Sequence, residues 1–376
     1  MVAVLVGYTS SAAIIFQAAS SAGASPAQLG SWMTALGLGM GITTLGLSYY
    51  YRTPILTAWS TPGAALLITS LHQVPMAEAI GAFIGCSLLL TIAGFSGLFS
   101  RLMHRLPLSL AAAMLAGILL RFGLNLFHAL EQAPLLVGSM LLLFLLIKPR
   151  LPRYTLALVL LMGVIVAAGS HQLQPLPPMH WLQLEWTTPQ FSWTGLFGIA
   201  VPLFMVTMSS QNLPGIAVLR SHGYQQVPVS PLVGWSGLTS LLLAPFGCFA
   251  LNLAAITAAL CMTEQADSDP RRRYLAACCA GALYLLTGVL GASVAGVLAS
   301  LPSPLIMAVA GLALLATLSN SLLQALRDEA DREAAMLTFL VTASGVQFAG
   351  IGSPFWGLVG GGAALLAARL SITTRH

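Results

Sequence analysis

The sequence predicts an all-α polytopic membrane protein with fourteen transmembrane segments, arranged as two inverted repeats of seven spans, with short strands in the broken spans 3 and 10. Three observations support this prediction. Of the 376 residues, 57% are hydrophobic and only 7% are charged, whereas charged residues make up about a quarter of a typical soluble domain. Apolar runs of about 18 residues or more recur along the chain. Short similar motifs return at offsets near two hundred residues.

The positions of the spans follow from turn signals and charged residues. When fourteen spans are threaded, every Lys and Arg except Arg121 falls on the same side of the membrane. Short cytoplasmic loops are rich in Lys and Arg, so both termini are expected in the cytoplasm, and the basic pI near 9.1 requires no nucleic acid as a partner. The expected spans lie near residues 2–22, 27–49, 53–70, 76–99, 106–124, 133–147, 153–170, 193–219, 229–246, 247–262, 272–299, 302–325, 332–350 and 354–373.

The chain divides into two halves at residues 170–190, a loop rich in Pro and polar residues that is expected on the outer side. Because each half has seven spans, the second must start on the opposite side of the membrane, and the repeats are therefore inverted. Inverted repeats are typical of secondary transporters, whose substrates bind near the midplane between broken helices at matching positions. The matching motifs are "TSSAAI" (9–14) and "MSSQNLPGI" (208–216), "SWMTALGLG" (31–39) and "GWSGLTSLL" (234–242), and "LPLSLAAAMLAGILL" (106–120) and "LPSPLIMAVAGLALL" (301–315).

The third span of each half is short and interrupted. Residues 53–70 contain the pair Pro62–Gly63, and residues 247–262 are barely long enough for a bilayer of about 30 Å. Each is expected to enter as an extended strand and to finish as a half-helix, with Thr61 and Asn252 as N-caps and Pro62 as the first residue of the first half-helix. Two opposed helix N-termini favour a small anion, such as a carboxylate, without a buried cation.

Polar side chains from the first span of each half are expected at the same site. The run "SSQN" (209–212) places four consecutive polar residues at membrane depth, where each needs a partner. A single Ser or Thr in a spanning helix more often bonds its own backbone or a neighbouring helix, Trp59 could be a packed aromatic, and Asn252 only a cap. Close helix packing is the expected role of "GLGMG" (37–41). The substrate-binding candidates are Tyr8, Ser10, Ser11, Trp59, Ser60, Thr61, Ser209, Ser210, Gln211, Asn212 and Asn252.

Charged residues are scarce inside the spans. No Asp or Glu lies securely within one, so proton coupling would use Glu78 at the start of the fourth span, a His, or a proton carried by the substrate itself. Arg121 is either a gate or anion attractor, or a snorkelling residue at a helix end. The five Cys have no metal-ligand spacing, so neither a metal nor a cofactor is expected.

Seven motifs are spread along the chain: "GYTSSAAIIFQAA", "GSWMTALGLGMG", "TPILTAWSTPGAAL", "LAAAMLAGILLRFG", "SSQNLPGIAVLRSHGY", "AAITAALC" and "GIGSPFWGL". Together they resemble the BenE-type benzoate/proton symporters of bacteria, which are grouped with the uracil and xanthine permeases and the sulfate-type anion transporters. The resemblance covers nearly the whole chain. It implies that the substrate lies between spans 1, 3, 8 and 10. Gln211 and Ile256–Thr257 stand near the two acidic residues of the uracil permeases, which adds Thr257 to the candidates, and neutral residues there suit a carboxylate.

The same resemblance implies a core domain and a gate domain that move against each other. The expected division is residues 1–105 as the first half of the core (spans 1–4), 106–170 as the first half of the gate (spans 5–7), 171–192 as the outer loop, 193–300 as the second half of the core (spans 8–11), and 301–376 as the second half of the gate (spans 12–14).

The function expected from the residues and the resemblance is import of benzoate or a similar aromatic carboxylate with protons, by alternating access, in the bacterial inner membrane. A nucleobase or inorganic-anion transporter of the same fold is the alternative. An intramembrane enzyme is disfavoured because no embedded His–Asp or His–Glu pair is found, and a receptor or structural protein would not need broken spans at matching positions. The expected partners are a small aromatic carboxylate, protons and the lipid bilayer, without nucleic acid, and a homodimer remains open.

Overall fold

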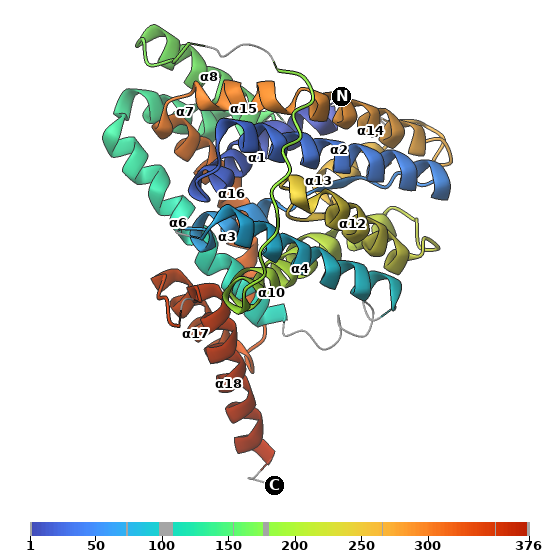
Figure 1. Cartoon of the computed structure of the whole chain (residues 1–376), viewed down its shortest axis with the longest axis vertical. Helices are drawn as coiled ribbons and strands as arrows, with labels where there is room; N and C mark the ends of the chain where they lie inside the picture. Colours follow the sequence, from blue (N-terminus) through green and yellow to red (C-terminus); the bar gives the residue numbers. More distant parts are fainter. Residues whose placement is uncertain are drawn as a thin grey trace.

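Helices make up most of the computed structural model, which describes residues 2–72, 74–97, 108–152, 154–175, 180–264, 266–349 and 351–373 (Figure 1). Two short strands, β1 (Thr57–Trp59) and β2 (Leu251–Leu253), interrupt them. The longer helices are α1 (Val2–Ser21), α2 (Pro26–Tyr51), α3 (Thr61–Ser70), α4 (Met76–Phe95), α6 (Leu108–Gln132), α7 (Pro134–Ile147), α8 (Thr155–Gly169), α12 (Val229–Leu243), α13 (Ile256–Met262), α14 (Tyr274–Val289), α15 (Gly291–Ala299), α16 (Ser303–Ala325), α17 (Arg332–Ser344) and α18 (Ser353–Thr373).

The predicted spans correspond to these elements nearly one for one. The main differences are α6, which continues to Gln132 instead of ending near residue 124, and the eleventh span, which is bent by 64° between α14 and α15. Within the described residues, five helices are long and apolar enough to cross a membrane: Met76–Phe95, Leu108–Gln132, Trp193–Ser221, Val229–Phe246 and Ser303–Ala325. The bent pair of α14 and α15 would be a sixth span. Several apolar spans are thus present, and the count of fourteen stays a prediction.

The two strands confirm that the broken segments begin as extended chain. β1 and β2 pair antiparallel, with Ala58 opposite Asn252 in the middle of the ladder. The pairing continues beyond the strands, because the Ser60 N–H donates to the Ala250 carbonyl over 3.1 Å. Unwound backbone at membrane depth must satisfy its polar groups inside the protein. Each broken segment supplies the hydrogen bonds that the other lacks.

The half-helices that follow the strands start differently from the prediction. Ser60, not Thr61, is the N-cap of α3, and its hydroxyl accepts a 3.1 Å hydrogen bond from the Gly63 N–H. The helix therefore begins at Thr61 rather than at Pro62. The predicted cap Asn252 is also wrong, because Asn252 lies in the middle of β2 and α13 begins only at Ile256.

The long helix from Trp193 to Ser221 contains two π-helical segments, η1 (Leu196–Ala200) and η2 (Met208–Asn212), around α10 (Val201–Thr207), with α9 (Trp193–Gly195) and α11 (Leu213–Ser221) at its ends. Each π segment ends two residues before a proline, Pro202 or Pro214. Proline cannot donate to the carbonyl four residues before it, and π-helical turns of this kind are frequent at functional sites. The "SSQN" run lies within the second segment.

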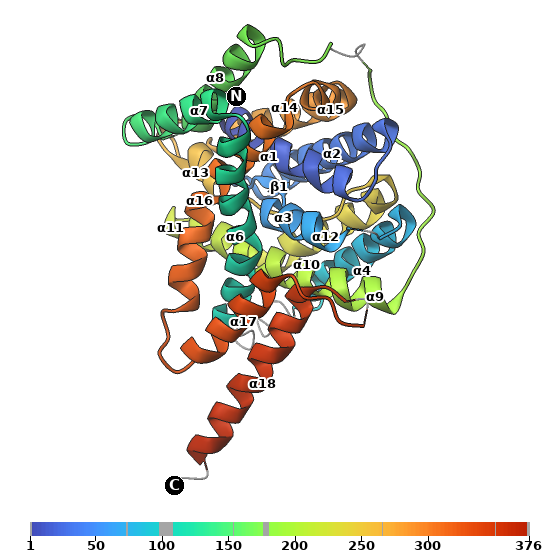
Figure 2. The ribbon, with the colours of Figure 1, turned by 90° about the vertical axis from the view of Figure 1, so that its left-hand side faces the viewer.

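Close helix pairs run through the molecule. α2 packs against α14, α4 against α12, and α6 against α16. Figure 2 shows α6 and α16 side by side. A Cβ added at Gly37 would overlap the backbone of Gly288, and one added at Gly94 would overlap Gly234. The prediction that "GLGMG" serves close packing is therefore confirmed at Gly37, since small residues let helix backbones approach.

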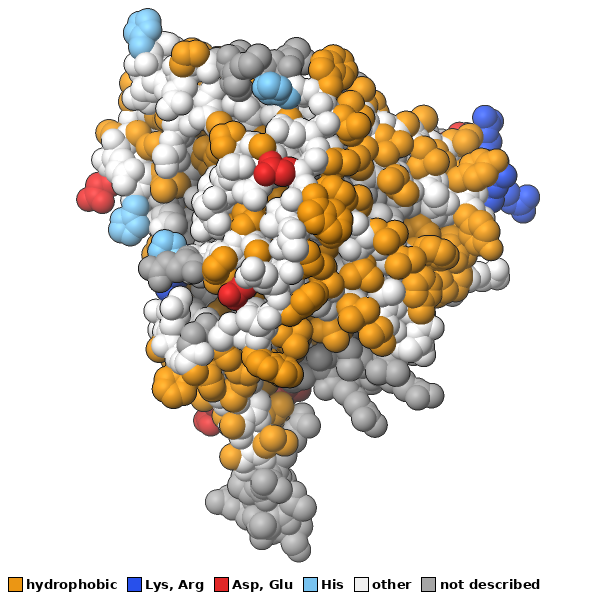
Figure 3. All heavy atoms as spheres, in the orientation of Figure 1, with side chains coloured by type: hydrophobic (Ala, Val, Ile, Leu, Met, Phe, Trp, Pro, Cys, Tyr) orange, Lys and Arg blue, Asp and Glu red, His pale blue; other side chains and the backbone are white. Residues whose placement is uncertain are grey.

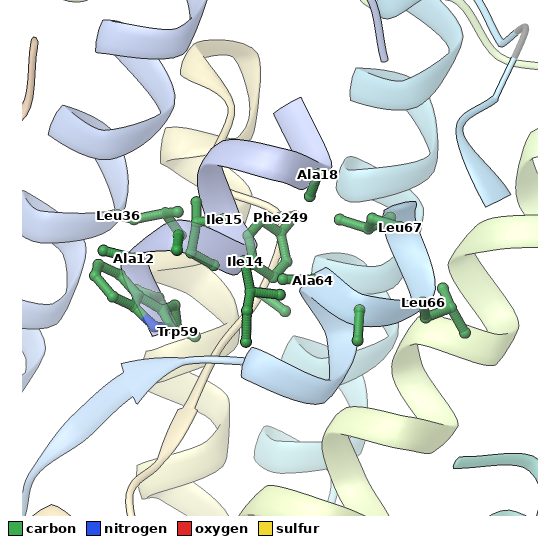
Figure 4. Packing of buried hydrophobic residues seen from close by; sticks show 14 of the residues in the cluster. Ala12, Ile14, Ile15, Ala18, Leu36, Trp59, Ala64, Leu66, Leu67 and Phe249 are labelled. Atoms are coloured by element: carbon green, nitrogen blue, oxygen red, sulfur yellow. The ribbon is translucent and has the colours of Figure 1, made fainter. Parts of the chain in front are cut away.

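Apolar packing surrounds the strands. Figure 4 shows Ala64 of α3 beside Ile14 of α1, and Leu67 of α3 pointing toward Ala18 of α1, all of them buried. On the face shown in Figure 3, hydrophobic side chains cover much of the surface, while Lys and Arg gather at one edge, near the ends of α2 and α14. An apolar exterior of this extent is what a lipid-facing surface requires.

Candidate functional site

A cavity of about 530 Å³ lies between two groups of helices. On one side are α1, the β1–α3 junction, η2 and the start of α13, and on the other side are α6, α7, α8 and α16. We call it the main cavity. Its volume lies within the range of small-molecule sites, about 300–1,000 Å³. Eight of the predicted site residues line it: Tyr8, Ser11, Trp59, Thr61, Ser209, Ser210, Gln211 and Thr257.

An aromatic group forms one wall of the main cavity. The rings of Tyr8 and Trp59 meet edge to face with their centroids 4.8 Å apart, and Tyr284 lies 6.3 Å from Tyr8. The indole N–H of Trp59 donates to the Ser11 hydroxyl over 2.7 Å, and that hydroxyl in turn donates to the Gly7 carbonyl over 2.8 Å. The polar edge of Trp59 is thus satisfied inside the protein, and its apolar ring contributes to the wall.

The "SSQN" run divides between the cavity and the packing behind it. Ser209 and Ser210 donate to the carbonyls one turn earlier in their own helix, over 2.7 and 2.6 Å. The oxygen of the buried Asn212 amide accepts the Leu253 N–H over 2.9 Å, which fixes β2 to η2. Gln211 also lines the cavity, and within the described chain no hydrogen bond joins its side chain to another residue.

Three predicted site residues do not line the main cavity. Ser60, Asn212 and Asn252 are almost completely buried behind its wall. Thr207 donates to the Ser60 hydroxyl over 3.0 Å, and Asn252, with its amide turned to suit its neighbours, accepts the Ser60 N–H over 3.1 Å. These side chains are corrected from ligand contacts to groups that hold the strands and the start of α3. The side chain of Ser10 lies outside the described residues.

The two charged candidates lie away from the main cavity. The Glu78 carboxylate, in the first turn of α4, accepts a 2.8 Å hydrogen bond from Ser192. Arg121 lines a second, smaller cavity together with His72 and Asn125. Neither residue lines the main cavity, so a direct role of either in substrate binding there has no support from the geometry.

Lys148 was missed by sequence reasoning. It is the only charged residue among the described residues that line the main cavity, and its ammonium group lies 4.8 Å from the centre of the Phe144 ring. In the sequence it belongs to the basic run "KPR" (148–150), which reads as an ordinary membrane-rim loop. No local signal distinguishes a rim lysine at a cavity mouth from one beside lipid.

A largely apolar cavity between packed helices, reached by broken segments with paired strands, defines a transporter-type membrane protein. The chain belongs to the BenE family, described as benzoate membrane transport protein, whose sequence profile matches residues 1–367.

Two relatives extend over nearly the whole chain. The chain is 50% identical over 367 residues to "Inner membrane protein YdcO" of Escherichia coli (strain K12), covering 96% of this chain and 92% of the relative. It is 38% identical over 357 residues to "Benzoate membrane transport protein" of Acinetobacter baylyi, covering 95% and 90%. The description of the family and the name of the Acinetobacter baylyi relative agree with the expectation that the chain is not an enzyme.

Solved structures share the fold at low sequence identity. The transmembrane domain of a cyanobacterial bicarbonate transporter, BicA, superposes with a TM-score of 0.56 at 17% identity, over 97% of this chain and 94% of that one. The structure of SLC26A9 superposes with a TM-score of 0.60 at 16% identity, over 99% and 65%. At such identity the likeness concerns the fold alone.

Proposed function

We propose that the protein is a secondary transporter of the bacterial inner membrane that imports benzoate, or a similar aromatic carboxylate, together with protons by alternating access. The observation that carries this proposal is the composition of the main cavity. An aromatic wall of Tyr8 and Trp59 stands beside the start of α3 and the polar segment η2. A planar apolar ring and a carboxylate need these two kinds of surface next to each other.

The carboxylate would bind where the helix starts and the polar segment meet. Thr61 lies at the start of α3, whose positive dipole end favours an anion. Gln211 has a free amide on the same cavity, and an amide N–H donated to a carboxylate is a charge-assisted hydrogen bond. Thr257, on α13, offers a further hydroxyl from the second repeat. The ring would lie against Trp59 and the Ala and Leu side chains of α6 and α16.

The proton would enter with the substrate. None of the described residues that line the main cavity is acidic or a histidine, and the Glu78 carboxylate is engaged by Ser192 elsewhere. Of the three routes that the sequence allowed, transport of the carboxylate with its own proton therefore has the best support. The substrate would bind as the carboxylate, which a fixed negative charge in the cavity would repel, and the proton would join its carboxyl group there before the cavity opens to the other side.

The proposal includes fourteen spans in two inverted repeats. Under that symmetry, span 2 corresponds to span 9 and span 4 to span 11. The contact of α2 with α14 then corresponds to that of α12 with α4, and the contact of α7 with α8 to that of α17 with α18. Both members of the first correspondence use a glycine-to-glycine approach, Gly37 with Gly288 and Gly234 with Gly94. Matching contacts of this kind support the repeat.

The proposed division into core and gate places the main cavity at the domain boundary. The helices on one side of it, α1, α3, η2 and α13, belong to residues 1–105 and 193–300, and those on the other side, α6, α7, α8 and α16, to residues 106–170 and 301–376. Movement of the core against the gate would expose the cavity to alternate sides. The Lys and Arg side chains gathered near the ends of α2 and α14 support cytoplasmic placement of these helix ends. Cytoplasmic placement of both termini is part of the proposal and rests on the distribution of Lys and Arg along the sequence.

Uptake of labelled benzoate into proteoliposomes, with and without an imposed pH gradient, tests the proposal. We expect accumulation that depends on the gradient, and loss of uptake in Gln211→Ala and Ser210→Ala while both variants still fold. Equal uptake with and without the gradient would refute proton coupling. Normal uptake in both variants would refute the site.

The alternative substrates are separated by binding. Thermal-shift measurements of the purified protein with benzoate, uracil and sulfate should show stabilisation by benzoate, because the lining of the main cavity is mainly apolar and aromatic. Stabilisation by uracil or sulfate without benzoate would favour a nucleobase or inorganic-anion transporter of the same fold.

A further inference from the structure

A second cavity of about 260 Å³ opens at the opposite end of α3 from the main cavity. It is lined by the C-terminal end of α3, the middle of α6, the loop after α17 and the start of α18. We call it the Arg121 cavity. Its polar lining consists mainly of Thr69, His72, Arg121, Asn125, Gln347 and Ser353.

The two cavities lie one after the other along the contact between α3 and α6. The first residues of α3, Thr61 and Pro62, line the main cavity, and Ile68 and Thr69 line the Arg121 cavity. On α6, Leu115 lines the main cavity and Phe122 lines the other. These two positions are seven residues apart in the helix, about 10 Å along its axis.

Apolar side chains close the passage between the two cavities. Ile118 and Leu119 of α6 and Ala65 of α3, which lie between the two sets of lining positions along their helices, are buried, and the two helices are in contact. The Arg121 cavity is therefore separated from the main cavity by a thin apolar seal, on the path that a substrate from the far side would take.

The chemistry of the Arg121 cavity suits an organic anion. Arg121 forms no ion pair with any described residue, and none of the described residues that line the cavity is acidic. Its guanidinium lies directly over Gly345, whose φ of +70° and lack of a side chain leave the space that the group occupies. Asn125 and Gln347 add amide donors, while Ile68 and Phe122 add apolar surface. A planar guanidinium binds a carboxylate through two parallel hydrogen bonds.

We propose that the Arg121 cavity is a second, preliminary binding site in which Arg121 binds the carboxylate of the transported aromatic acid before the seal between α3 and α6 opens. This inference rests on the proposed function. In the proposed orientation the cavity faces the periplasm, so it concentrates the substrate on the side from which import begins. An unpaired cation in an open cavity also raises the rate at which an anion is captured.

Initial rates of benzoate uptake by intact cells, measured against benzoate concentration, test this site. Arg121→Gln should raise KM about tenfold with little change in the maximal rate, since it removes one charge-assisted contact. Arg121→Lys should raise KM less, because it keeps the charge and loses the planar geometry. Asn125→Asp, which places a negative charge beside Arg121, should raise KM severalfold. Arg220→Gln, an exposed charge outside both cavities, is the matched control and should leave KM unchanged.

Ionic strength gives a second readout. KM of the wild type should rise with salt as the attraction is screened, and KM of Arg121→Gln should rise much less. Membrane abundance of each variant serves as the folding control, and Asn125→Asp decides the test if Arg121→Gln does not reach the membrane. The Arg121 site would be refuted if Arg121→Gln and Asn125→Asp both had KM values within twofold of the wild type. If Gln211→Ala still abolished uptake, the proposed function would stand. Absence of uptake by the wild type would refute both.

Discussion

The indole Nε1 of Trp59 donates a 2.7 Å hydrogen bond to the hydroxyl of Ser11, and this contact joins β1 to α1 across the wall of the main cavity. Both residues are almost fully buried. The bond fixes the orientation of the indole ring, so that its apolar surface rather than its polar edge contributes to the cavity.

Two substitutions remove this hydrogen bond, and they should lower the free energy of unfolding by different amounts because they leave different groups behind. Ser11→Ala leaves the buried indole N–H without an acceptor, which costs about 1–3 kcal/mol, whereas Trp59→Phe leaves the Ser11 hydroxyl bonded to the Gly7 carbonyl. The apparent Tm of the detergent-solubilised protein, taken through a double-mutant cycle, should show a coupling of about 1 kcal/mol. Additive effects of the two substitutions would contradict the contact.

Gln211 and Asn212 are neighbours with opposite expected roles. Gln211→Ala should reduce uptake ten- to a hundredfold at unchanged Tm, because a hydrogen bond to a charged group contributes about 1.5–3 kcal/mol. Asn212→Ala should lower the free energy of unfolding by about 1–3 kcal/mol, because it leaves the Leu253 N–H unpaired. Uptake rates and thermal unfolding measured on the same preparations check both. A large fall in the Tm of Gln211→Ala would contradict the assignment of Gln211 to substrate binding and Asn212 to stability.

Ser60 and Thr61 form a second matched pair. Ser60→Ala removes the cap of α3 and the acceptor of Thr207, and should lower the free energy of unfolding by at least about 1 kcal/mol. Thr61→Ala should leave Tm nearly unchanged and raise KM for benzoate, because Thr61 lines the main cavity and caps nothing. Reversed effects in the two variants would restore the original prediction that Thr61 is the cap.

Glycine matters at only some positions of α2. Gly37→Ala should destabilise the protein by about 1–3 kcal/mol, since the added methyl group would overlap Gly288 of α14. Gly46→Ala, in the same helix, should be neutral or stabilising, because no atom lies within 4 Å of a Cβ built there and alanine favours the helix. Thermal unfolding of the two variants provides the comparison, and equal Tm values would argue against the α2–α14 contact.

Lys148 should influence affinity through its charge. Lys148→Gln is expected to weaken benzoate binding to the detergent-solubilised protein by about two- to fivefold at low salt, an effect that is small because exposed charges are screened. Lys148→Arg should retain most of the affinity, and Arg150→Gln, which lies outside the main cavity, serves as the control. Equal Kd values for the wild type and Lys148→Gln at low salt would exclude the role.

Many helix boundaries were predictable because they depend on local features: apolar runs, charges and the Pro and Gly residues that interrupt them. α6 shows the limit of that signal. Polar residues near position 124 suggested that the helix ends there, yet it continues to Gln132. Asn125 and His128 are exposed, and exposed polar side chains are compatible with a helix, so they do not mark its end. The two π-helical segments were likewise not predicted, although Pro202 and Pro214 mark their positions.

The choice between adjacent residues was not available from the sequence. Ser60 and Thr61 are both acceptable caps, and the decision comes from strand pairing: the Ser60 N–H bonds to Ala250, which holds Ser60 in the extended conformation that an N-cap requires. Asn252 has the side chain of a cap, but the same pairing places it opposite Ala58, inside the strand.

The sequence by itself determined the class of protein, most of its helices, and the two interrupted segments, because hydrophobicity and the missing hydrogen bonds of proline act within a few residues. Only the tertiary structure decided which polar groups face the main cavity. That outcome depends on how β1 and β2, almost two hundred residues apart, pair with each other and on which neighbours then use the hydroxyl of Ser60 and the amides of Asn212 and Asn252. The side chains of Gln211 and Thr61 remain available at the cavity because no described neighbour forms a hydrogen bond with either of them.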